Sequence, residues 1–345
     1  MEEKYLINNK KKFYFTFASI LLVSALLSAL VVIVEPQIIL GQSIIYSILV
    51  FILLTVIFSL LIPPINKYVI ELLKQKYTYY ILSSCILLFL PLLNWIYATE
   101  FKQAIISYLI WYFLPTVLFI IPAFIENFRF DFLFHIAAVV LFATGFDGRF
   151  TSDTLSGFSS SEYNFNALWV SSLILILYSI QLNEFEEKTN WKPTKKGILY
   201  ALNLSAVLAI ISIPIGLLTN FLEWAPNFSD VPMIFISFIG IWMTIALPEE
   251  LIARGVIQHQ LTHRVVKKEG KYFRYWKWSI LIVASVIFGV SHWNNTSPEF
   301  IWVYILLASI AGIAYGICWW KGGLFSAILI HTLVDWVWQL FFKSA

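Results

Sequence analysis

Six ionisable residues lie inside strongly apolar stretches of the last third of the sequence. They are Glu249, Glu250, Arg254, His292, His331 and Asp335. An ionisable group at membrane depth costs roughly a few kcal/mol or more, so such residues usually have a function. Carboxylates and imidazoles are also the groups with which enzymes accept and return protons. The residue types therefore indicate hydrolytic chemistry, and the alternative is an ion pair and two histidines that only hold helices together.

The spacing of these residues separates the two glutamates. Glu250 and Arg254 are four residues apart, so on a helix they pair on one face. Glu249 points to a different side of the same helix. His331 and Asp335 are also four residues apart and share a face. We therefore expect Glu249 to be the acid that works beside two imidazoles.

The polar groups also lie at similar depths. Glu249, His292, His331 and Asp335 are between 10 and 15 residues from the nearest predicted cytoplasmic charge. At about 1.5 Å per residue this corresponds to roughly 15–22 Å, provided that the helix does not break near Gly255. Three helices are thus predicted to place their polar groups in one layer.

The elements that hold these groups are predicted from composition. The chain has 345 residues, of which 60% are hydrophobic and only 12% are charged. A soluble domain carries about twice that charged fraction. Long uncharged stretches recur along the whole chain, so the predicted fold class is all-α, a polytopic membrane helix bundle. The net charge of +3 comes without a basic patch, which argues against a nucleic-acid partner.

Eleven stretches are candidate transmembrane helices. They are 13–34, 43–65, 77–97, 104–125, 132–146, 167–182, 197–218, 232–264, 278–292, 300–320 and 322–342. With a cytoplasmic N-terminus, eleven crossings place nearly all loop lysines and arginines on the cytoplasmic side, as the positive-inside rule requires. The short span 132–146 is needed for this asymmetry. The loop 264–277 is then cytoplasmic, and the loop 145–165 lies on the opposite side.

Three short motifs resemble those of the CPBP family, the CAAX-protease and bacteriocin-processing intramembrane proteases, also called the ABI family. EELIAR (249–254) is similar to EExxxR, and FGVSH (288–292) resembles FxxxH. HTLVD (331–335) resembles a motif of His followed four residues later by Asn or Asp. The resemblance covers about 232–342. We therefore predict a catalytic transmembrane core at 221–345 and motif-free helices at 1–220, within one continuous membrane domain.

The resemblance implies hydrolysis of a peptide bond inside the bilayer. By family analogy Glu249 activates the water with help from His292, while His331 and Asp335 stabilise the oxyanion. The supporting residues of the same motifs are Glu250, Arg254 and Phe288. The prenyl-protein endopeptidases of the family have Asn where this chain has Asp335, and an ionised Asp cannot donate a hydrogen bond. Asp335 is therefore expected either to be protonated or to orient His331.

No metal cofactor is expected, because the motif begins with carboxylates and is not HExxH. If zinc is present, its expected ligands are Glu249, His292 and His331. His259 and His263 are also four residues apart, but a solvated interfacial helix face is the favoured interpretation there. Gln258 and His259 could also line a substrate entrance.

The expected partners are the lipid bilayer and a membrane-associated protein or peptide substrate, either a prenylated CAAX protein or a leader peptide. The abundance of Ile, Phe, Lys and Asn indicates an AT-rich prokaryotic genome, so the expected location is a prokaryotic plasma membrane. One alternative is a non-catalytic scaffold or regulator of a partner membrane protein. Another is a transporter with a proton-relay carboxylate. Paired broken helices in two halves would favour the transporter, and the sequence does not show them.

Overall fold

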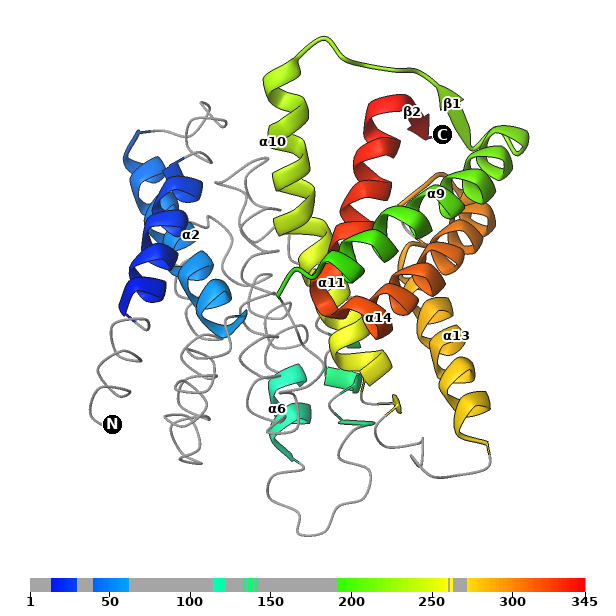
Figure 1. Cartoon of the computed structure of the whole chain (residues 1–345), viewed down its shortest axis with the longest axis horizontal. Coiled ribbons are helices and arrows are strands. Elements are labelled where there is room, and N and C mark those ends of the chain that lie inside the picture. Colours follow the sequence, from blue (N-terminus) through cyan, green and yellow to red (C-terminus); the bar gives the residue numbers. More distant parts are fainter. Residues whose placement is uncertain are drawn as a thin grey trace. The chain divides into compact units, whose positions relative to one another are not determined.

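The computed structural model describes ten stretches of the chain. They are 14–29, 40–61, 114–121, 133–134, 136–138, 140–141, 192–259, 261–262, 272–293 and 295–344. The secondary structure of these stretches is helical apart from one two-stranded ribbon (Figure 1). The chain forms two compact units, residues 1–102 with 152–186 and residues 103–151 with 187–345.

The described residues contain four helical stretches that are long and apolar enough to cross a membrane. They are Lys195–Leu218, Val231–Gln258, Phe273–Ser291 and Pro298–Phe341. This confirms a helical membrane protein. The count of eleven crossings and the cytoplasmic N-terminus stay predictions. The spans 77–97 and 167–182, the loop 145–165 and most of the loop 264–277 lie outside the described residues.

In the first unit, residues 14–29 are helical and α2 spans Leu40–Leu61. The buried hydrophobic side chains of α2 follow a helical repeat, with spacings of three and four residues. They are Val50, Leu53, Leu54, Ile57, Leu60 and Leu61. Such a stripe is the contact face of a helix that packs against other helices. In the second unit, α6 spans Leu114–Ile120.

The second unit contains the motif-bearing helices together with α9 (Lys195–Leu218). Helix α9 begins at Thr194, whose Oγ1 accepts a hydrogen bond of 3.0 Å from the backbone N of Gly197. After α9 the chain turns through Asn220, which adopts a left-handed φ of 55°. Strand β1 (Leu222–Trp224) then pairs antiparallel with β2 (Phe342–Ser344) near the C-terminus (Figure 1). The ribbon therefore ties the end of α9 to the end of the chain.

The helix with the glutamates runs without a break from α10 (Val231–Ile241) to residue 258, which agrees with the predicted span 232–264. It continues through η5 (Trp242–Ala246), α11 (Leu247–Glu250) and η6 (Leu251–Gln258), and both η segments are π-helical. Pro248 explains the first of them. A proline inside a helix removes one backbone hydrogen bond and crowds the carbonyl four residues earlier, which belongs to Thr244. A wider π turn relieves that crowding, and such turns are frequent at functional sites.

Helices α13 (Phe273–Ser291) and α14 (Ile301–Phe341) carry the other two motifs, with the short η7 (Pro298–Phe300) between them. A helix of 41 residues would be about 60 Å long, which is twice the apolar thickness of a bilayer. Gly323 interrupts α14 with φ 79° and ψ −172°. Figure 1 shows the two halves, orange and red, meeting at an angle. The predicted boundary between spans 300–320 and 322–342 is therefore present.

The first half of α14 packs against α9 and α13, and glycines allow the backbones to approach closely. A Cβ added at Gly322 would lie 2.6 Å from Cα of Gly197 on α9. A Cβ added at Gly289 of α13 would lie 2.6 Å from the carbonyl oxygen of Ile305 on α14. The helices that carry the site are therefore held together at a spacing that larger residues would not permit.

We expect Gly322→Ala to lower the unfolding temperature of the detergent-purified protein, because the new Cβ meets backbone that can move only with all of α9. The matched control is Gly240→Ala, where the added Cβ has nothing within 4 Å. That control should be neutral or stabilising, since Ala is favoured over Gly in helices by about 1 kcal/mol. The unfolding temperature is measured as the midpoint at which the peak of monodisperse protein is lost on heating. An unchanged midpoint for Gly322→Ala would contradict the close approach.

Candidate active site

Glu250 and Arg254 form an ion pair inside the second unit. Arg254 Nε donates to Glu250 Oε2 over 2.9 Å, and both side chains are 0% exposed. Arg254 Nη1 also donates to Gln258 Oε1 over 3.3 Å, and the guanidinium lies 5.4 Å from the centroid of the Phe288 ring. The pairing expected from the four-residue spacing is therefore present. Removing one partner of such a buried ion pair strongly destabilises the folded protein, because the other charge is left buried and unpaired.

His331 of α14 contacts three carboxylates. Its Nδ1 lies 3.0 Å from Glu250 Oε1, and its Nε2 lies 3.3 Å from Asp335 Oδ2 and 3.7 Å from Glu249 Oε2. Because an ionised carboxylate only accepts hydrogen bonds, Nδ1 is the donor toward Glu250. Glu250 thus holds the imidazole in one orientation with Nε2 toward the other two acids. Spacing alone did not predict this contact, since the two residues are far apart in the sequence.

His292 caps the C-terminal end of α13. Its Nδ1 lies 2.8 Å from the backbone carbonyl oxygen of Phe288, one turn earlier. A carbonyl accepts, so Nδ1 carries a proton, and the neutral ring then has its lone pair on Nε2. That Nε2 atom lies 3.7 Å from Glu249 Oε2. The four-residue spacing of FGVSH therefore fixes both the position and the tautomer of the imidazole.

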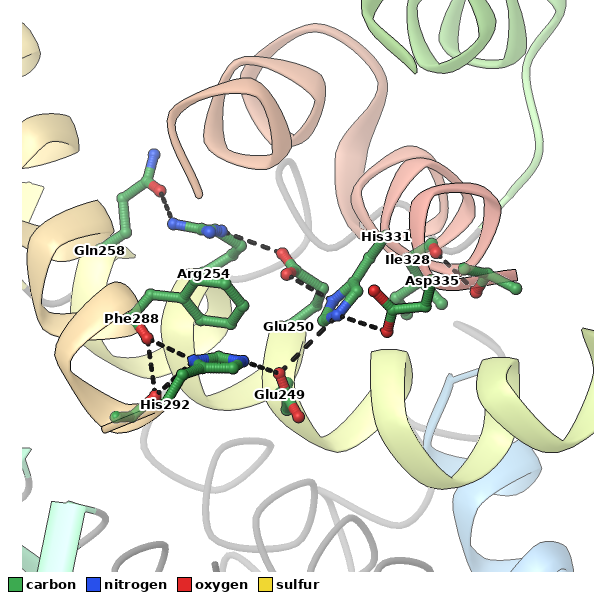
Figure 2. A network of polar contacts seen from close by, with 11 residues as sticks. Glu249, Glu250, Arg254, Gln258, Phe288, His292, Ile328, His331 and Asp335 are labelled. Atoms are coloured by element: carbon green, nitrogen blue, oxygen red, sulfur yellow. Dashed lines mark hydrogen bonds and ion pairs between the residues drawn. The ribbon is translucent and has the colours of Figure 1, made fainter. Parts of the chain in front are cut away.

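Glu249 lies between the two imidazoles, and one oxygen, Oε2, is the atom nearest to both (Figure 2). Its side chain is 30% exposed, and that of Asp335 is 32% exposed, whereas Glu250 is fully buried. Glu249 and Asp335 are therefore the partly exposed acids of the cluster, although the Glu249 oxygen that faces the histidines, Oε2, is itself buried. Contacts of 3.7 Å exceed hydrogen-bond length, and a water molecule can bridge groups at such distances.

The structure brings the four predicted catalytic residues together from three helices. They are Glu249, His292, His331 and Asp335, and their predicted supports Glu250, Arg254 and Phe288 contact them. The expectation for His259 was wrong, and the expectation for His263 stays untested. His259 does not lie on a solvated helix face, because it is 4% exposed and packs edge to face against Trp319. Its predicted neighbour His263 lies outside the described residues.

Gln258 contacts the site although it belongs to none of the three motifs. It is fully buried and accepts the hydrogen bond from Arg254, so it does not line an open entrance. A Cβ added at Gly316 of α14 would lie 2.7 Å from Gln258 Oε1, so the amide packs directly against that helix. A signal was present in the sequence, because Gln258 follows Arg254 by one helical turn on the same face.

A metal centre is the alternative use of the same residue types. Among the described residues, no group of three or more histidine, cysteine, aspartate or glutamate side chains is arranged to hold a metal ion. Each imidazole of the cluster lies within 4 Å of at least one carboxylate, and such pairs can transfer protons. A helical membrane protein with such a cluster has the residue types that an intramembrane hydrolase needs.

The comparison with protein families supports the same class. Residues 231–337 match the family model described as Rce1-like, Type II CAAX prenyl endopeptidase Rce1-like. The matched segment contains all three motifs and every residue of the cluster. The resemblance to the CAAX-protease family is therefore confirmed, and this integral membrane protein carries a domain of a protease family. Comparisons with curated proteins and with solved structures found no significant match.

We expect Glu250→Ala to destabilise the protein by about 3–5 kcal/mol, because it leaves Arg254 buried without its counter-charge. Glu249→Ala is the matched control, since the neighbouring side chain is partly exposed and is not part of that ion pair. The measurement compares the detergent-solubilised variants by thermal unfolding. Equal unfolding midpoints for the two variants would show that the ion pair does not stabilise the fold.

Proposed function

We propose that this protein is an intramembrane endopeptidase in which Glu249 activates a water molecule for attack on a peptide bond. The observation that carries the proposal is the position of Glu249 Oε2, 3.7 Å from Nε2 of both His292 and His331. The neighbouring Glu250 is engaged by Arg254 and by His331 Nδ1. One carboxylate is thus held in a structural network while the other faces the imidazoles and solvent.

His292 supplies the second contact to the attacking water. Its Nδ1–H donates to the Phe288 carbonyl, so Nε2, which lies 3.7 Å from Glu249 Oε2, is the ring nitrogen that can accept a hydrogen bond from a water molecule. A water molecule that contacts both the Glu249 carboxylate and His292 Nε2 would be oriented by the two groups. Glu249 takes its proton as the water oxygen attacks the carbonyl carbon, which is general base catalysis.

His331 is the donor for the oxyanion. Because both of its ring nitrogens face carboxylates, two N–H protons suit this imidazole best, one toward Glu250 and one on Nε2. The Nε2–H is aimed by the Asp335 carboxylate at 3.3 Å and lies on the same side as Glu249. This supports the role of Asp335 as the group that orients His331, in place of a direct oxyanion donor. Charge stabilisation of this kind is usually the largest contribution to catalysis.

No other reagent is needed to complete the reaction. The C–N bond of the tetrahedral intermediate breaks, and the proton held by Glu249 passes to the leaving amine. The carbonyl fragment leaves as a carboxylic acid. The substrate reaches the cluster from the side of Glu249 and Asp335, because these are its partly exposed carboxylates.

The proposed substrate is a membrane-associated protein or peptide, either a prenylated CAAX sequence or a leader peptide, in a prokaryotic plasma membrane. The family match supports the first of these, since its description is that of a CAAX prenyl endopeptidase. Prenylation places the cysteine of such a sequence at the bilayer surface. A site on membrane-spanning helices suits a substrate that arrives anchored to lipid.

We expect Glu249→Gln to lower the turnover of a cleaved substrate at least 100-fold, the order that loss of a general base produces, while the protein stays folded. The assay uses a farnesylated CAAX peptide and a leader-peptide reporter in proteoliposomes, with products identified by mass spectrometry. Glu223→Gln, an exposed residue of β1, is the matched control and should keep full activity. Near-normal turnover by Glu249→Gln would show that the assigned base is wrong. No cleavage by the wild type would favour the scaffold role.

We expect Asp335→Asn to keep or raise activity, because the amide still contacts His331. The wild type should contain no stoichiometric zinc by elemental analysis. In the zinc alternative Glu249, His292 and His331 would be the ligands and Asp335 their support. Loss of that support costs about 10–100-fold in affinity or activity. Zinc near one per chain, lost together with activity in Asp335→Asn, would replace the proposed mechanism by a metalloprotease.

A further inference from the structure

Two tyrosines of α14 lie against the two histidines of the site. Tyr304 and Tyr315 are eleven residues apart, and eleven residues complete about three helical turns, so both rings are on one face of the helix. Neither residue belongs to any of the three motifs. The positions between them on that face are small, Ala308 and Ala311, which leaves room for side chains from α13.

Tyr315 stacks on the imidazole of His331. The ring centroids are 4.7 Å apart and the planes are inclined by 20°. Phe288 approaches the same imidazole edge to face, at 5.7 Å and 88°. Tyr315 is only 2% exposed, so its ring has no freedom to move away. The plane of His331 is thus set by a flat surface, while its Nδ1 is set by Glu250.

Tyr304 plays the corresponding part for His292. Their centroids are 5.4 Å apart with planes at 68°, and Phe288 meets the same imidazole at 4.8 Å and 61°. The Tyr304 ring is itself packed against Phe221, at 5.4 Å, and Trp338, at 6.2 Å. It is therefore fixed by residues that lie before the motif helices and near the end of the chain.

Phe288 is the common neighbour of both histidines, and its own position depends on α14. A Cβ added at Gly312 would lie 3.3 Å from Phe288 Cδ1, so the ring packs directly over that glycine. One helix thus supplies Tyr304, Tyr315 and the small surface that seats Phe288. This arrangement explains how imidazoles from α13 and α14 direct their Nε2 atoms toward the same oxygen of Glu249.

We propose that Tyr304 and Tyr315 are positioning residues whose rings fix the imidazole planes of His292 and His331 for the reaction at Glu249. The inference rests on the proposed function, because it assigns the tyrosines a part in the same hydrolysis. The inference concerns the rings, because it is argued from the ring-to-ring contacts of the two tyrosines with the two histidines. Loosening either ring misaligns Nε2, and small misalignments of catalytic groups lower the rate far more than they weaken substrate binding.

The experiment compares Tyr315→Leu with Tyr315→Phe in the peptide-cleavage assay described above. Tyr315→Leu removes the flat surface and should lower kcat about 10-fold or more while KM changes less than about 2-fold. Tyr315→Phe keeps the ring and should stay within about 2-fold of wild type in both constants. The pair Tyr304→Leu and Tyr304→Phe should behave in the same way. Trp302→Leu is the control, because this aromatic residue of the same helix is 79% exposed.

Each outcome decides the proposal. A loss in Tyr315→Phe as large as in Tyr315→Leu would assign the role to the hydroxyl and overturn it, and so would normal kcat in Tyr315→Leu. If Tyr315→Leu does not fold, Tyr315→Met fills more of the volume without a flat ring and takes its place, with the same expected loss. Glu249→Gln is measured in parallel. Normal turnover there would defeat the proposed function, whereas inactive Glu249→Gln with unaffected tyrosine variants would defeat only this inference.

Discussion

The rest of the site depends on one buried network, in which Arg254 binds Glu250 and Glu250 binds His331. Neither carboxylate oxygen of Glu250 is exposed, and each has its own partner. Removing a charge from water is costly, and only complete pairing offsets that cost. The network therefore fixes the distance between the helix that carries Glu250 and the second half of α14. The same requirement aims His331 Nε2 away from Glu250 and toward Glu249.

The carboxylates and the arginine of the cluster fall into a fully buried group and a partly exposed group. Glu250 and Arg254 are fully buried, whereas Glu249 and Asp335 are each about a third exposed. The buried half fixes geometry, because its charges cannot exchange partners with water. The exposed half is where a water molecule and a peptide would enter. Two adjacent glutamates on one helix acquire different roles because one points into the protein and its neighbour points toward solvent.

Asp335 gives this site a charge distribution different from one built with asparagine. Three carboxylates surround a single imidazole, and among the described residues one arginine, Arg254, pairs with one of them. Each ring nitrogen of His331 therefore has a carboxylate that can accept its N–H. This supports an oxyanion donor on His331 that is aimed by Asp335. It also makes the planes of the rings around His331 important, since the direction of its N–H decides what it can stabilise.

The sequence by itself determined the contacts and shared faces that depend on helical periodicity within one helix. The pairing of Glu250 with Arg254, the shared face of His331 and Asp335, and the separation of Glu249 follow from positions on a single helix. The break near Gly323 also followed from local sequence. Only the tertiary structure decided which helix faces which. The hydrogen bond from His331 to Glu250, the burial of Gln258 and His259, and the rings of Tyr304 and Tyr315 on the histidines join separate helices. Periodicity fixes the direction of a side chain around its own axis, but the partner it meets depends on how closely the glycines of α9, α13 and α14 let the backbones approach.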